Sequence, residues 1–183
     1  MKTGVTVKSI TVTNFPQMKP LPRTDAMHLE AAHGWLELGD HVSTYDETEK
    51  ITPQLRAHPD VLELRWKIFA KALKWQDCLS IAETVADVVP RRATSWLLLA
   101  STLRSMGQLE DAYNALIEVI DGFEDNAPIR FQLACYAAEL GNLQEAKKWL
   151  EEAIARDDSK EMKMLALKEK ASDALWKDIW QLD

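Results

Sequence analysis

Few residues of this 183-residue chain have the types and spacing that catalysis or metal binding requires. His28 and His33, in HLEAAH, come nearest to a zinc pair. Two zinc-binding histidines on one helix stand at i and i+4, whereas these two are five residues apart. No Cys-x-x-Cys pair or carboxylate triad accompanies them. The sequence therefore predicts no metal site, and His28 is expected to pack against its neighbours.

Cys135 and two carboxylate pairs are the remaining candidates for chemistry. A cysteine nucleophile needs a nearby base, and all four histidines precede residue 93. Glu151-Glu152 and Asp157-Asp158 are expected on a polar helix face and in a loop, without the burial that tunes catalytic acids. The six glycines form no phosphate-binding loop. We therefore expect no enzyme and no cofactor, and we expect Cys135 to be a small groove or core residue.

Net charge and hydropathy further limit the classes of binding partner that we expect. The net charge is −7, which argues against nucleic acid, because phosphate binding needs a basic face. Residues 1–24 carry +4, which leaves −11 on the rest of the chain. No run approaches the roughly 18 apolar residues of a membrane span, and the N-terminus has no signal-peptide run. With only two cysteines, at unrelated positions, the expectation is a cytoplasmic protein without membrane or nucleic-acid partners.

A 34-residue period organises most of the chain. Leu99 is followed at that spacing by Leu133, and Gly107 by Gly141. A period of 34 indicates repeated helix–turn–helix units, each too small to bury its own apolar face. Four units tile the chain as 25–58, 59–92, 93–126 and 127–160. Their inter-helix turns fall at Gly39, Leu73, Gly107 and Gly141.

The pattern predicts two helices in each unit, one on either side of the turn. First helices are expected near 26–38, 59–73, 93–106 and 127–140, and second helices near 42–52, 75–88, 109–121 and 143–156. Residues 161–183 are expected to form a closing helix over the last repeat. Residues 1–24, β-branched and then proline-rich, are expected to be an extended basic arm.

The third and fourth units resemble the tetratricopeptide repeat. The third carries Trp96, Leu99-Ala100, Leu103 and Gly107, and the fourth carries Leu133-Ala134, Tyr136 and Gly141. The first two units match less well: His28 stands in the tryptophan position, and Trp66 stands where a small residue is usual. The resemblance covers about three quarters of the chain. It implies an all-α, right-handed superhelix of antiparallel helix pairs whose concave groove binds peptides or proteins without catalysis.

The family register also implies which residues line the groove. The candidate binding residues are Leu29, His33, Leu36, Glu63, Lys67, Lys71, Leu97, Ser101, Arg104, Phe131, Cys135 and Ala138. Glu37, Ala70, Ser105 and Glu139 fill the other groove positions. The carboxylate clamp of chaperone-binding members is absent, since Leu29, His33, Leu64, Thr94 and Leu98 hold its positions.

Two readings remain open for the groove side chains. The apolar ones, such as Leu29, Leu36, Leu97 and Phe131, are either an exposed contact site or buried against second helices. The cations Lys67, Lys71 and Arg104 either attract an acidic peptide or pair within their helices, as Glu63 and Lys67 are spaced to do.

The functional prediction is a scaffold for a protein or peptide partner. The alternative is a structural subunit that self-associates as a homodimer through its terminal helix or its N-terminal arm. In a further variant, the arm occupies the groove of its own chain.

Overall fold

The computed structural model describes residues 18–157, and every regular element in this range is a helix. The contacts divide the chain into two units, one ending at Pro90 and the other resuming at Arg91.

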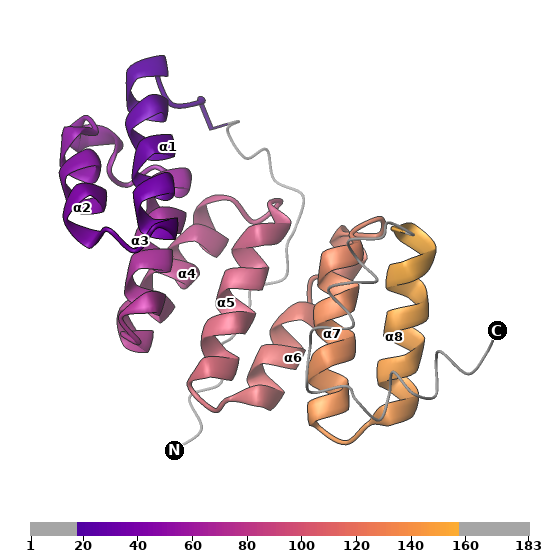
Figure 1. Cartoon of the computed structure of the whole chain (residues 1–183). Helices are drawn as coiled ribbons and strands as arrows, with labels where there is room; N and C mark the ends of the chain where they lie inside the picture. The colour runs from indigo at the N-terminus through magenta and orange to yellow at the C-terminus, as the bar shows by residue number, and fades with distance from the viewer. Residues whose placement is uncertain (1–17, 158–183) are drawn as a thin grey trace. The chain divides into compact units, whose positions relative to one another are not determined.

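The first unit holds two helical hairpins (Figure 1). Its elements are α1 (Arg23–Glu37), α2 (His41–Lys50), the 3₁₀ turn η1 (Pro53–Leu55), α3 (Pro59–Lys71) and α4 (Trp75–Val88). The Asp40 carboxylate starts α2 by accepting the Ser43 N–H at 2.9 Å, a helix N-cap. Pro59 occupies the first turn of α3, where its missing N–H costs nothing. The two first helices, α1 and α3, also contact each other.

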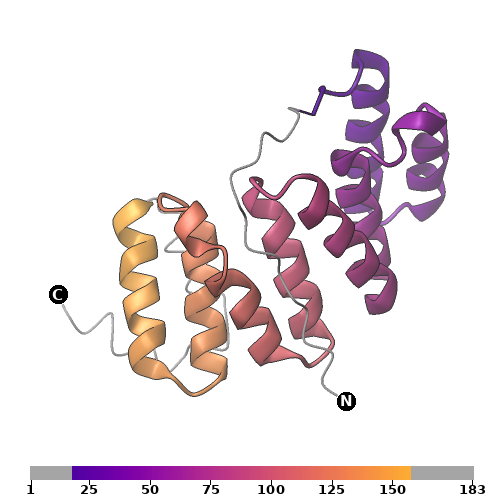
Figure 2. The ribbon, with the colours of Figure 1, turned by 180° about the vertical axis from the view of Figure 1, so that it is seen from behind.

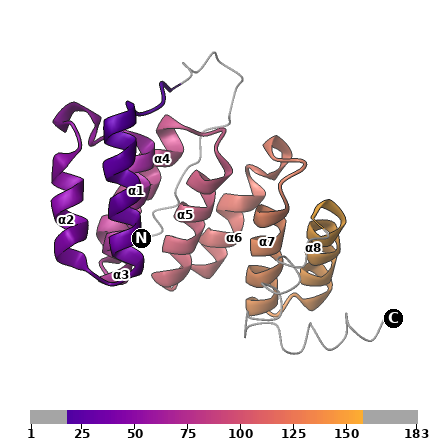
Figure 3. The same ribbon diagram turned by 45° about the horizontal axis from the view of Figure 1, so that its top comes forward.

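The second unit repeats this plan (Figures 2 and 3). Its elements are α5 (Ala93–Ser105), α6 (Leu109–Ile117), the 3₁₀ turn η2 (Ile120–Gly122), α7 (Ala127–Glu139) and α8 (Leu143–Arg156). The Asn126 side chain caps α7 by accepting the Ile129 N–H at 2.9 Å. Helix α7 contacts its hairpin partner α8 and both preceding helices, α5 and α6.

The helices expected within the four repeats are all present, and two of their ends are shifted by three or four residues. Helix α6 ends at Ile117, short of the expected 121, because Val119 and Ile120 turn inward and are buried. Helix α1 begins at Arg23, inside the segment expected to be extended, because Pro22 stands directly before its first turn. The expected closing helix at 161–183 and residues 1–17 of the expected arm lie outside the described residues.

One backbone turn closes all four first helices. After α1, the Asp40 N–H bonds the Trp35 carbonyl at 2.9 Å and the Gly39 N–H bonds the Leu36 carbonyl at 3.2 Å. This is a Schellman motif, which requires a left-handed residue after the helix. Gly39, Gly107 and Gly141 supply it with φ of +78°, +80° and +84°. Leu73 adopts the same conformation with φ of +56°, although a side chain is strained there.

Leu73→Gly is therefore expected to stabilise the protein. Glycine adopts the left-handed conformation without the strain of about 1–2 kcal/mol that a side chain causes there. The greater conformational entropy that glycine loses on folding offsets about 0.5–1 kcal/mol of this gain. Leu73 is 70% exposed, so little packing is lost. Urea unfolding measures the net gain. Leu38→Gly is the control, since Leu38 is equally exposed but right-handed with φ of −73°, and it should destabilise. A loss of stability in both variants would contradict the assignment of strain to Leu73.

The core lies between the helices of each hairpin and between successive first helices. In the first unit it contains a cluster of Leu29, Ala32, Leu36, Ile51, Val61 and Leu64. The small residues Thr44, Cys78, Ala112 and Ala146, one on each second helix, are at most 1% exposed. Their size allows the paired helices to approach closely, as the repeat pattern predicted.

Candidate functional site

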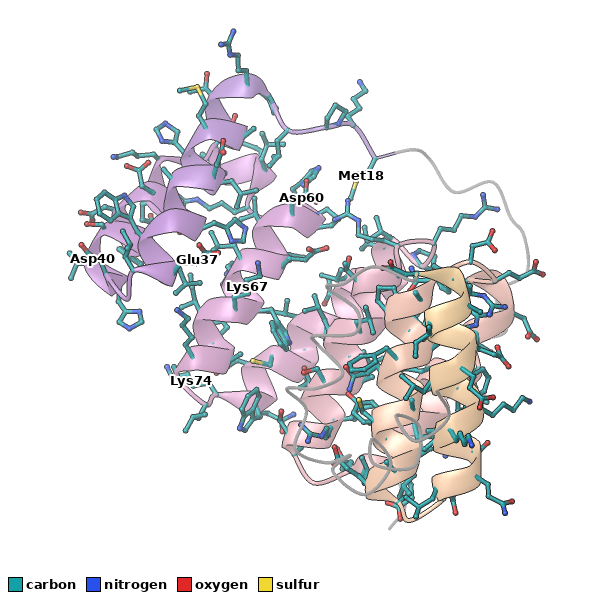
Figure 4. The ribbon with its side chains drawn as sticks, turned by 45° about the vertical axis from the view of Figure 1, so that its right-hand side comes forward. Met18, Glu37, Asp40, Asp60, Lys67 and Lys74 are labelled. Carbon is teal, nitrogen blue, oxygen red and sulfur yellow. The ribbon has the colours of Figure 1, made fainter. Side chains whose placement is uncertain are left out.

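A pocket of about 240 Å³ lies between α1 and α3. It is lined by His33, Leu36 and Glu37 from α1 and by Trp66, Lys67, Ala70 and Lys71 from α3. Glu37 and Lys67 lie on these neighbouring helices, whereas Lys74 lies past the end of α3 (Figure 4). The pocket gathers six side chains that the family register had assigned to the groove, together with Trp66.

Helical spacing brings these residues to one surface. His33, Leu36 and Glu37 are three and four residues apart, as are Lys67, Ala70 and Lys71, so each set follows one helix face. The two sets occupy corresponding positions of successive repeats, and α1 contacts α3. The 34-residue period therefore places them opposite each other.

The pocket has an apolar floor and a charged rim. Leu36 is 2% exposed, and Trp66 and Ala70 are partly buried. The Lys71 ammonium donates a hydrogen bond to the Leu36 carbonyl in the last turn of α1. A cation is favourable there because the C-terminal carbonyls of a helix carry partial negative charge. Lys71 is thereby held at the rim, and both Lys67 and Lys71 are exposed to solvent.

Burial and the neighbouring charges together set the protonation state of His33. Burial is the main cause that lowers the pKa of His33, and the positive charge of Lys67 lowers it further. Glu37 and Glu63 act in the opposite direction without reversing the shift. The imidazole is therefore neutral at pH 7, and it can accept or donate a hydrogen bond at the pocket mouth.

This shift predicts a pH-dependent stability. As the pH falls below the ordinary histidine value of about 6.5, the unfolded chain binds a proton at His33 that the folded chain does not. The free energy of unfolding should decline until the pH passes the lowered folded-state pKa of His33. Urea titrations of the wild type and His33→Gln across this range measure the effect. A wild-type slope no steeper than the variant's would contradict the prediction.

Several groove residues expected to be exposed are buried. Leu29 and Leu36 are 9% and 2% exposed and belong to the core cluster, because with Ala32 they form the inward stripe of α1. In the second unit Phe131 and Cys135 are 4% and 3% exposed. Of the two readings left open, the exposures of Leu29, Leu36 and Phe131 fit burial against neighbouring helices, and Cys135 is buried as a small groove or core residue can be. Leu97, Ser101 and Ala138 are partly buried.

Arg104 is engaged with a neighbouring helix. Its guanidinium contacts both oxygens of the Glu139 carboxylate, with Nε at 2.9 and 3.0 Å and Nη2 at 2.7 Å. This bidentate pair joins α5 to α7 across the surface assigned to the groove of the second unit. Of the two readings left open for Arg104, the structure shows pairing, but with a neighbouring helix and not within its own helix.

Trp66 is the pocket residue that sequence reasoning missed. The register assigns its position to the helix contact, where a small residue is usual. The departure from that pattern was visible in the sequence, and it was the signal that this site differs from the other repeats.

The described range offers few other features for chemistry. Within residues 18–157, no three His, Cys, Asp or Glu side chains are grouped so that they could hold a metal ion. Cys78 and Cys135 are free thiols and buried. None of the helices from α1 to α8 is long and apolar enough to span a bilayer.

The successive helical hairpins define a helical-repeat protein, and similarity to known proteins identifies the type of repeat. Residues 103–170 match the tetratricopeptide repeat family. This part of the chain is therefore similar to the tetratricopeptide repeat, a helical repeat that serves as a scaffold for protein interactions. No curated protein matches the chain in sequence.

Solved structures agree with this fold. The crystal structure of the MamA protein is similar with a TM-score of 0.57 and 15% identity, over 74% of each chain. MamA 41-end from Desulfovibrio magneticus RS-1 gives a TM-score of 0.60 at 12% identity, over 89% of this chain and 97% of that one. At such identities the likeness shows the fold alone.

Proposed function

We propose that this protein is a binding scaffold whose α1–α3 pocket receives a side chain from a segment of a partner protein. The observation that supports the proposal is the pairing of an apolar floor, Leu36 and Ala70, with a charged rim. Ligand sites commonly combine apolar walls with a few polar groups that fix orientation. The volume of about 240 Å³ suits one large apolar side chain.

The rim suggests the chemistry of the partner segment. Lys71 is bonded to the Leu36 carbonyl, so the exposed Lys67 is the cation better placed to meet a ligand. We infer a segment with an apolar side chain followed or preceded by an acidic residue. Glu63 and His33 complete the binding residues that we propose in this unit. In the second unit Leu97, Ser101 and Ala138 remain candidates.

Matched charge reversals test the proposal. Lys67→Glu changes the pocket rim, and Lys74→Glu makes the same change beyond the end of α3. Ala70→Leu fills the pocket without changing charge. Full-length wild type and variants are used as bait in host lysate, with captured proteins identified by mass spectrometry and folding checked by circular dichroism.

The expected result is a prey that the wild type and Lys74→Glu capture and that Lys67→Glu and Ala70→Leu lose. A prey retained equally by all four baits would contradict the pocket as the site. Loss of the same prey from both charge variants would show a dependence on net charge alone.

We also propose a reducing, cytoplasmic location. The free thiols of Cys78 and Cys135 support it, because cytoplasmic proteins keep their cysteines reduced.

A further inference from the structure

Five large apolar side chains of the first hairpin are exposed to solvent. We call this set the α1–α2 face, defined by Met27, Trp35, Leu38, Val42 and Tyr45. They are 60%, 39%, 77%, 73% and 64% exposed. Ala31 and Gly34 lie between Met27 and Leu38 along the same stripe of α1. Monomeric proteins seldom expose so many neighbouring apolar groups without a partner.

In the second unit, the corresponding helix surface is covered by neighbouring helices. Met27, Ala31 and Gly34 correspond, three repeats later in register, to the side chains of Ile129, Leu133 and Tyr136 on α7. All three of the latter are 0% exposed, and α7 is contacted by the preceding helices α5 and α6. The corresponding stripe of α1 is thus a helix-packing surface that is exposed among the described residues.

We propose that a second copy of this chain covers the α1–α2 face, in a two-fold dimer with the two α1 helices antiparallel. The stripe reads large, small, small, large along Met27, Ala31, Gly34 and Leu38. In the antiparallel orientation Met27 meets the partner's Leu38, and Ala31 meets the partner's Gly34. The small residues at the centre let the helix axes approach closely, while Val42 and Tyr45 extend the contact along α2. Such a self-complementary patch is what a two-fold interface requires.

Opposite charges at the two ends of α1 also favour the antiparallel orientation of the two α1 helices. Arg23 stands at the start of α1 and Glu37 at its end, on the same flank of the helix. Antiparallel packing brings each Arg23 toward the partner's Glu37, so two opposite-charge contacts form. It also places the positive end of each helix dipole beside the negative end of the other.

Gly34→Lys tests the contact without threatening the fold. A Cβ at Gly34 would meet no atom within 4 Å, and lysine favours a helix more than glycine does. Gly122→Lys is the matched control, because Gly122 lies in the second unit and its Cβ would also meet no atom. Light scattering after size exclusion, over a range of concentrations, measures the mass, and urea unfolding confirms that each variant is folded.

The wild type and Gly122→Lys are expected at twice the monomer mass of 20.8 kDa, and Gly34→Lys at the monomer mass. Arg23→Glu should raise the dissociation constant of the dimer about tenfold, which corresponds to 1.4 kcal/mol, and adding Glu37→Arg should restore it. A monomeric wild type, a dimeric Gly34→Lys, or a charge swap that restores nothing would each overturn the proposal.

Discussion

Replacing Leu36 by alanine is expected to lower the free energy of unfolding by about 2–5 kcal/mol. Leu36 is 2% exposed and packs in the cluster with Leu29, Ile51 and Leu64, so truncation leaves a cavity among side chains from three segments. Urea unfolding followed by far-ultraviolet circular dichroism measures the loss. The result bears directly on the groove, because the register had assigned Leu36 to a surface for ligands.

Leu38→Ala is the matched control, two residues further along. Leu38 is 77% exposed, so the same truncation should change the free energy of unfolding by less than about 0.5 kcal/mol. Equal losses in the two variants would contradict the assignment of Leu36 to the core. Because Leu36 is also the pocket floor, its effect on partner capture is interpretable only where the variant remains folded.

The repeat architecture could be read from the sequence because it depends on local and periodic signals. The 34-residue period located every hairpin turn, and the structure shows the same Schellman geometry after each first helix. Glycine at three of the four turns reflects the left-handed backbone, which few other residues adopt. Leu73 shows that the surrounding packing, and not glycine itself, imposes this conformation.

The exposure of individual side chains could not be predicted from the 34-residue period. The register assigns Leu29 and Leu36 to a helix face, but their exposure depends on how far Ile51 and Val61 extend toward them. The Arg104–Glu139 pair was missed for a related reason. Ion pairs that spacing alone predicts lie within one helix, whereas these residues are 35 positions apart on α5 and α7. Contacts between repeats depend on side-chain size and direction, which the period does not contain.

The pocket was partly predictable. The period placed His33 and Glu37 opposite Lys67 and Lys71, as the structure shows. It did not predict that Trp66 would line the cavity or that Lys71 would bond the end of α1. Of the two, only Trp66 is a departure of the second repeat from the family pattern.

Arg130→Met is expected to lower the free energy of unfolding by about 2–4 kcal/mol, the second large effect. The Arg130 side chain is 6% exposed, and its Nε donates to the Glu152 carboxylate at 3.2 Å. Its Nη1 donates to the carbonyls of Phe123 at 2.8 Å and Asn126 at 3.2 Å. Methionine preserves much of the apolar volume but removes these partly buried hydrogen bonds, and a hydrogen bond to a charged group contributes about 1.5–3 kcal/mol. Thermal unfolding and denaturant titration measure the loss.

Arg156→Met separates this effect from the loss of charge. Arg156 also contacts Glu152 and donates to the Glu124 carbonyl at 2.6 Å, but its side chain is 30% exposed, so water replaces the lost donor. Its expected cost is about 1 kcal/mol or less. Arg130→Lys keeps the charge without the planar fork and should fall between the two. Equal losses at both arginines would mean that charge near Glu152 matters more than the buried hydrogen bonds. A larger loss at Arg130 would identify it as the residue that fixes the connection between α6 and α7, and with it the spacing of the third and fourth repeats.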